Sequence, residues 1–172
     1  MTQNTIEERI LAEFEQAFQD NAPMRVQWRN KITRADGTIE ELIIPKNIVT
    51  KDGLNALATR AVGVATSAIA YLAIGTVTAA HSLGSTVTMF GEISRKTPSI
   101  LTTSKMTVIV TMTWAGAADG LTGIALGSAA CVNHASSGLG IAYNLTNSVN
   151  ATLAASDFLL LEADIQIGSH NL

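Results

Sequence analysis

The stretch Lys105–Trp114, KMTVIVTMTW, limits the fold more than any other part of the chain. Its even-numbered positions from 106 to 114 are methionine, valine, valine, methionine and tryptophan, whereas positions 107, 111 and 113 are threonine and position 109 is isoleucine. Alternation with a period of two is typical of a strand in a sheet and does not fit a helix. The strand therefore has one apolar face and one neutral, hydrogen-bonding face, and both suit contact with more protein.

Other stretches repeat this pattern. AIAYLAIG, at 68–75, is apolar at odd and even positions alike, which predicts a strand buried on both faces. FLLLEADIQI, at 158–167, alternates between apolar and acidic or amide side chains. We expect shorter strands at 121–127 and 139–145, with a loop at 128–138 between them.

Several short strands, Gly- and Ser-rich turns and only two helical segments predict a mainly β protein. The expected architecture is a jelly-roll-like β-sandwich with an N-terminal amphipathic helix and one further short helix. We expect residues 1–23 to be an N-terminal helical arm and 24–172 to be a single sandwich domain. The whole chain has 172 residues, which is enough for one substantial core.

Within the sandwich domain we expect a hairpin at 24–44, a helix at about 51–62 that Thr50 caps, and strands from 68 onward. The alternating apolar positions and the two tryptophans define a candidate core. Its members are Trp28, Tyr71, Val108, Val110, Trp114, Leu161, Ile165 and Ile167.

The N-terminal arm begins with the sequence of a capping box, TIEE at 5–8, in which a threonine precedes a glutamate by three positions. Apolar residues then recur at helical spacing. They define a candidate partner-docking face made of Ile6, Ile10, Phe14 and Phe18. The face fits either against the protein's own sheet or a neighbouring copy, or against a different virion or cell-surface protein, and the sequence leaves both readings open.

Charge is distributed unevenly along the chain. Residues 1–60 hold 17 of the 25 Lys, Arg, Asp and Glu residues, and none lies between Leu121 and Ser156. Soluble domains normally carry charge on their surface, so we interpret the neutral region as a surface that partner subunits cover, and we expect a homo-oligomer. Membrane insertion is not expected, because the most apolar stretch, 61–74, is shorter than the roughly 20 residues that span a bilayer.

The hairpin at 24–44 has a basic face that contains Arg25, Arg29, Lys31 and Arg34. Two glutamates on its returning strand are expected to pair with these cations, and the net charge of the chain is −3. We therefore expect no binding of nucleic acid. The polar N-terminus has no signal for export, and the single cysteine fits a protein made in a reducing cytoplasm.

The polar residues offer few candidates for a catalytic or metal site. Cys131 and His134 form a Cys-x-x-His pair, but a closed zinc site would need two more ligands, for which only His81 and His170 remain. The pair also has no evident carboxylate to orient it for nucleophilic catalysis. Glu162 and Asp164 share one strand face near Asp157 and are expected to be a solvated or subunit-facing edge rather than an acid–base pair. The sequence thus predicts no catalytic residue, cofactor or metal.

The order of the motifs resembles that of a group of small tailed-bacteriophage virion proteins. The resemblance rests on KNIVTKDGLNALA, YLAIGTVT, TMFGEISRK, LTGIALGSA and ATLAASDFLLLEADIQIG, which together span about residues 46–168. It implies a non-enzymatic building block of a virion that is assembled in the host cytoplasm. Its position would be at the neck, tail or fibre attachment or as a capsid decoration, with portal, tail or capsid proteins as partners. The alternative is a host-recognition module of a tail fibre that binds a glycan through loops at 76–88 and 128–138.

Overall fold

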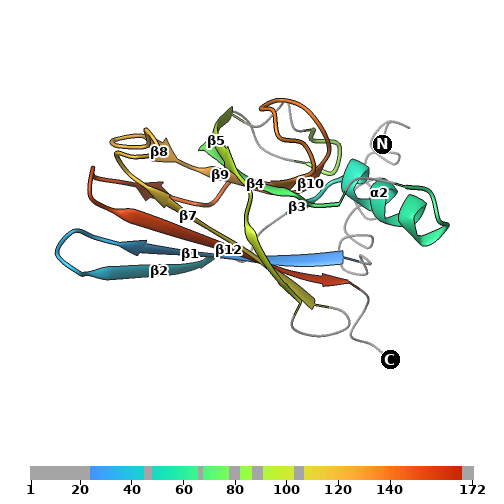
Figure 1. The fold of residues 1–172 in the computed structure, drawn as a ribbon, viewed down its shortest axis with the longest axis horizontal. Coiled ribbons are helices and arrows are strands. Elements are labelled where there is room, and N and C mark those ends of the chain that lie inside the picture. The colour runs from blue at the N-terminus through green and yellow to red at the C-terminus, as the bar shows by residue number, and fades with distance from the viewer. Residues whose placement is uncertain are drawn as a thin grey trace, which may run out of the picture.

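The chain is mainly β. The computed structural model describes residues 24–44, 48–65, 68–77, 82–86, 91–102 and 107–167. In these residues it has two five-stranded antiparallel sheets, a two-stranded sheet and one helix. The strands of the two large sheets lie one above the other in Figure 1, with the β1–β2 turn at one end of the molecule and the helix at the other.

The first large sheet, called sheet A, has the strand order β2-β1-β12-β7-β6. Its strands are β1 (Met24–Thr33), β2 (Ile39–Ile44), β6 (Ser99–Thr102), β7 (Thr107–Ala115) and β12 (Phe158–Ile167). Strand β12 lies at the centre and pairs along its full length with β1, so that the first and last strands of the domain are neighbours. The hairpin expected at 24–44 consists of β1 and β2.

On sheet A, the alternation of apolar and polar residues in the sequence corresponds to an alternation of buried and exposed side chains. Along β1, buried residues at even positions alternate with exposed or half-buried ones. On β12, Leu159, Leu161, Ala163 and Ile165 are buried in the same way. One face of sheet A therefore packs on the core, and its other face carries the threonines of β7 and the charged side chains of β1 and β12.

The second large sheet, called sheet B, has the strand order β3-β10-β9-β4-β5. Its strands are β3 (Ile48–Val49), β4 (Tyr71–Thr76), β5 (Gly91–Lys96), β9 (Ser128–Val132) and β10 (Ala142–Thr146). The two-stranded sheet pairs β8 (Ala125–Leu126) with β11 (Ala151–Thr152). All residues of β9 and β10 are buried, and so are the four inner residues of β4, so the three central strands of sheet B are buried on both faces.

One sequence prediction is wrong in this region, and two expected strands have different bounds. Residues 128–132 are not part of a loop but form β9, one of the most buried strands of the protein. The strand expected at 139–145 is β10, which begins three residues later, and the strand expected at 121–127 is reduced to the two residues of β8. The reason is that β9 is made of small residues with no polar face, SAACV, and therefore shows no alternation.

The helix, α2, spans Lys51–Ala61. Thr50 caps it, because its side-chain oxygen accepts a hydrogen bond from the backbone N–H of Gly53 at 3.0 Å. At Gly53 the helix approaches β10 so closely that a Cβ atom would lie 2.4 Å from the carbonyl oxygen of Tyr143. The side of α2 that is buried centres on Gly53 and Ala56, whereas Ala58 is exposed.

Both large sheets contribute side chains to one hydrophobic core. Trp28 and Trp114 of sheet A are fully buried, as are Leu72 and Cys131 of sheet B, and all four belong to the same cluster. The indole N–H of Trp114 donates to the Ser94 hydroxyl of β5 at 3.1 Å, which adds a polar link between the sheets.

The other expected core residues differ in burial. Val110, Leu161 and Ile165 are buried, whereas Val108 and Tyr71 are partly buried and pack against core clusters. The backbone of Ile167 pairs with Met24, but its side chain lies outside the described residues. The arm at 1–23, with Ile6, Ile10, Phe14 and Phe18, also lies outside them, as do residues 78–81, 87 and 88 of the expected loop at 76–88.

Candidate assembly interface

The two edge strands of sheet A expose large apolar side chains. Among the strands that the structure describes, β2 pairs only with β1, and β6 pairs only with β7. Leu42 and Ile43 of β2 are 42% and 52% exposed, and Ile100 and Leu101 of β6 are 52% and 61% exposed. An edge strand presents unpaired backbone N–H and C=O groups, so an apolar edge of this kind is a template for pairing with another chain. These two edges are the candidate functional site.

The edges of sheet B, in contrast, have features that oppose pairing. Strand β3 has only two residues, and Thr50 directly after it begins α2. Strand β5 has a β-bulge: Ile74 of β4 faces Ser94 and Gly75 faces Glu92, which leaves Ile93 as the extra residue. Short edge strands, bulges and charged side chains are the usual means by which proteins prevent edge-to-edge association.

The bulge also creates an ion pair on β5. Glu92 and Arg95 are three residues apart and would point to opposite faces of a regular strand, but the bulge returns them to one side. Their side chains are each 3% exposed, and two hydrogen bonds of 2.5 and 2.7 Å join the guanidinium to the carboxylate. The Arg95 guanidinium also donates to the carbonyl oxygens of His134 and Leu139 and so holds that loop on the strand.

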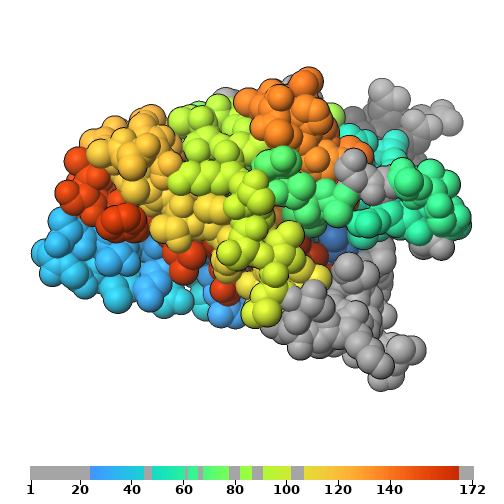
Figure 2. Space-filling model, viewed as in Figure 1, coloured from blue at the N-terminus to red at the C-terminus, as the bar shows by residue number. Residues whose placement is uncertain are grey.

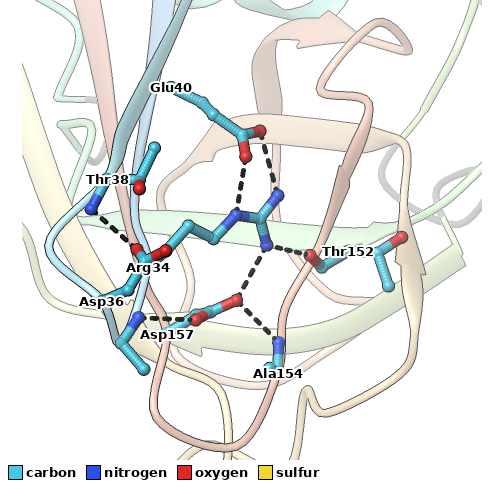
Figure 3. Close-up of polar contacts among 8 residues, drawn as sticks. Arg34, Asp36, Thr38, Glu40, Thr152, Ala154 and Asp157 are labelled. Carbon is cyan, nitrogen blue, oxygen red and sulfur yellow. Dashed lines mark hydrogen bonds and ion pairs between the residues drawn. The ribbon is translucent and has the colours of Figure 1, made fainter.

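A second polar cluster locks the closed end of the β1–β2 hairpin to the segment before β12 (Figure 3). Arg34 forms a bidentate pair with Glu40, at 2.8 and 2.9 Å, and donates to Asp157 Oδ2 at 2.7 Å. The carboxylate of Asp157 also accepts from the backbone N–H groups of Ala35 and Ala154, at 3.2 and 2.9 Å. Figure 2 shows the blue hairpin packed beside the red segment that leads into β12.

The charges in this cluster stabilise one another. The hydrogen bond from the Ala154 N–H, followed by that from Arg34, lowers the pKa of Asp157 below its ordinary value. The Arg34 pair lowers the pKa of Glu40 in the same way, and the two carboxylates raise the pKa of Arg34. All three groups are therefore ionised near neutral pH. Each polar atom named here has a partner within the chain. Because Glu40 belongs to β2 and is joined through Arg34 to Asp157, the cluster holds the edge strand β2 in place.

A third ion pair joins β5 to the turn after β7. The Lys96 ammonium lies 2.6 Å from Asp119 Oδ1. Asp119 Oδ2 accepts from the backbone N–H of Ala115, also at 2.6 Å. The hairpin charges likewise have acidic neighbours, since Arg29 lies 3.7 Å from Glu162 on β12. The expectation that glutamates would pair with the basic face holds for Arg34 and Glu40, whereas the partner of Arg29 comes from a strand far away in the sequence.

The structure separates the residues of the Cys-x-x-His motif. Cys131 is fully buried within β9, and burial raises the pKa of its thiol to about 12, so the thiol is protonated and unreactive. His134 is exposed in the following loop, where its Nδ1 accepts from the backbone N–H of Ser136 at 3.0 Å. In the described ranges, no three His, Cys, Asp or Glu side chains come together as a metal site would require.

Sequence reasoning did not find several buried polar residues. Asn30 lies on the core face of β1, and its amide nitrogen donates to the carbonyl oxygen of Val149. Asn144 lies opposite Cys131 in the centre of sheet B and is fully buried. Its side-chain amide forms no hydrogen bond with a nitrogen or oxygen atom of the residues that the structure describes. An asparagine at an expected core position of an alternating strand, as at Asn30, is the signal that could have revealed the first of these.

The uncharged region from Leu121 to Ser156 has an explanation within the chain itself. It contains β9 and β10, whose residues are all buried inside the molecule. Its lack of charge is thus accounted for in part by sheet B, and it supports an oligomer less strongly than the sequence suggested. The exposed apolar side chains of β2 lie instead in the hairpin at 24–44, outside this uncharged region.

Comparisons with models of protein families, with curated proteins and with solved structures found no match. In the described residues, the single helix α2 has 11 residues and falls short of the length and apolar character needed to cross a membrane.

Proposed function

We propose that this chain is a non-enzymatic structural protein of a tailed-phage virion and that copies of it assemble into a homo-oligomer. The single observation that carries the proposal is the pair of apolar edges of sheet A, β2 and β6, neither of which has an outer partner among the described strands. Monomeric proteins normally protect such edges, as this one does in sheet B. The assignment to a phage virion rests on the resemblance of residues 46–168 to small virion proteins.

The polar clusters support a structural role. The Arg34–Asp157 and Lys96–Asp119 ion pairs each join segments that are separate in the fold. The Glu92–Arg95 pair lies within β5, and Arg95 also binds the loop after β9. A catalytic carboxylate or base would instead need a free position beside a substrate. The buried thiol of Cys131 is protonated and has no access to a substrate.

The proposal includes a fold and a set of partners. The two sheets form a jelly-roll-like sandwich around their shared core, with β12 between β1 and β7. Other virion proteins at the neck, tail, fibre attachment or capsid surface are the further partners, and the arm at 1–23 is the segment that docks on them. The location is the virion, after assembly in the host cytoplasm.

A glycan-binding tail-fibre module is the weaker candidate. The loop proposed for it at 128–138 loses residues 128–132 to the buried strand β9, which removes part of the expected binding surface.

Size-exclusion chromatography with light scattering on the full chain tests the self-assembly. The expected molar mass is a fixed multiple of the 18.0 kDa protomer, unchanged over a tenfold dilution in the micromolar range. A stable monomer throughout that range would overturn the proposal. A glycan array with the same protein tests the alternative, and specific binding by a monomer would favour it.

A further inference from the structure

We infer that copies of this chain join head to tail, with β6 of one copy alongside β2 of the next in a parallel pair that continues sheet A across the subunits. The inference rests on the proposed self-assembly and specifies its interface. The occupant of each open edge is thus a second copy of the same chain. The argument depends on the strand directions, on the faces of the exposed residues and on the charges of the two edges.

The strand directions follow from the topology. Each of the four neighbouring pairs in sheet A is antiparallel. In a five-stranded sheet of this kind the two outer strands run in the same direction, so β2 and β6 are parallel to each other. If the next copy is related to the first by a rotation about an axis parallel to the strands, β2 of the next copy runs parallel to β6 of the first. Repeated addition of this kind closes into a ring if the rotation divides the circle.

The faces of the exposed residues then match. Residues that lie directly opposite each other in a sheet point to the same face. Following the cross-strand pairs from Ile43 through Arg29, Glu162 and Thr111 leads to Ser99. Leu101 is two positions after Ser99 on β6, so it shares the outer face of sheet A with Ile43. Leu42 and Ile100 share the opposite face, since the same pairs connect them to core residues.

A parallel alignment therefore brings Leu101 beside Ile43 and, at the same time, Ile100 beside Leu42. An antiparallel alignment can match only one of the two pairs, because it places Leu101 opposite Glu41 whenever Ile100 faces Leu42.

Charge disfavours the symmetric alternatives. Glu40 is already paired with Arg34, but pairing β2 with a second β2 would bring Glu41 of both copies onto one strand pair, where like charges are destabilising. Strand β6 has no charged residue and accepts β2 without that repulsion. Pairing β6 with a second β6 aligns one apolar pair and leaves the β2 edge of each copy open. The head-to-tail joint covers both edges with a single kind of interface.

Cysteine cross-linking of the full chain tests this geometry. Directly adjacent residues on neighbouring strands are close enough for a disulfide. The variant that carries both Ile43→Cys and Leu101→Cys is expected to form a ladder of covalent multimers under mild oxidation. Each single variant is expected to stay uncross-linked, and an equimolar mixture of the two to give a covalent dimer only. Both positions are exposed, and the native Cys131 is buried, so the wild type serves as the unreactive reference.

The matched control combines Leu42→Cys with Leu101→Cys, which places the thiols on opposite faces of the continued sheet and is expected not to cross-link. Dimers of the Leu101→Cys single variant would show a β6–β6 interface and overturn the inference. So would an oligomer in which the 43–101 pair fails to cross-link while light scattering still shows self-association. A monomer by light scattering would instead refute the proposed function itself, so the two failures are distinguishable.

Discussion

Sheets A and B of this protein differ in how their faces and edges are buried. Sheet A has long alternating strands, one apolar face with two tryptophans, one polar face and open apolar edges. Sheet B has shorter strands of mostly small residues, is buried on both faces at its three central strands, and has a short strand at one edge and a bulged, charged strand at the other. The comparison indicates that sheet B completes the fold of the single chain, whereas sheet A retains the capacity to bind further chains.

Small residues allow this arrangement in sheet B. A Cβ atom at Gly75 would lie 2.0 Å from the carbonyl oxygen of Gly91, so β4 and β5 approach each other at the bulge only because that position is glycine. Ala73 and Ala130, which lie opposite each other on β4 and β9, are fully buried with little side-chain volume. Small side chains of this kind allow other segments of the chain to pack closely on both faces of the sheet. The sheet then exposes little polar surface to solvent.

The largest expected effect tests whether the two sheets share one core. Trp114→Ala removes a fully buried side chain and its hydrogen bond to Ser94, and is expected to lower the free energy of unfolding by about 3–5 kcal/mol. Chemical denaturation followed by fluorescence and circular dichroism measures it. The exposed neighbour Thr113→Ala is the control and should change stability by about 0.5 kcal/mol or less. Two separate unfolding transitions, one for each sheet, would contradict the shared core.

An intermediate effect is expected at the protected edge of sheet B. Glu92→Ala leaves the Arg95 guanidinium buried without its carboxylate and should cost about 3 kcal/mol of stability. The control is Glu162→Ala on the outer face of sheet A, where the contact with Arg29 is 3.7 Å long and partly exposed and contributes about 0.5 kcal/mol or less. Equal losses in the two variants would contradict the distinction between the sheets.

The smallest effect concerns pH and the hairpin end of sheet A. The folded state lowers the pKa of Asp157, so its ionised form contributes stability above the unfolded-state pKa of about 4, and that contribution is lost as the pH falls through the folded-state value. Asp157→Asn should therefore lower the melting temperature by a few degrees at pH 7. Thermal scans from pH 7 to pH 2.5 should show the gap from wild type narrowing below about pH 4. A gap that stays constant would show that the carboxylate charge is not what locks the hairpin.

Alternating strands could be predicted from the sequence, because a face is a property of neighbouring residues. The strand at 158–167 and most of the strand at 105–114 appear with the apolar face that their patterns indicated. Strand β9 could not be found in this way, since SAACV is buried on both faces and has no alternation of polar and apolar positions. Its neutrality is equally consistent with a subunit interface, because burial by the same chain and burial by another chain have the same effect on composition.

The polar contacts depended on distances that no local pattern contains. Arg34 and Asp157 are 123 positions apart and meet because β1 and β12 are neighbours. Glu92 and Arg95 are three positions apart and would lie on opposite faces of a regular strand, and they pair because a bulge changes which side chains share a face. Cys131 and His134 are close in sequence, yet the end of β9 places one in the core and the other in solvent.

By itself, the sequence determined the β class of the chain, the faces of its alternating strands and the position of its capped helix at Thr50, because these follow from the periodicity and hydrogen bonding of adjacent residues. The tertiary structure alone decided which strands became neighbours, which edges remained open and which charges found partners. Those outcomes depend on pairing between segments far apart in the chain, and the local pattern of a strand is compatible with many neighbours.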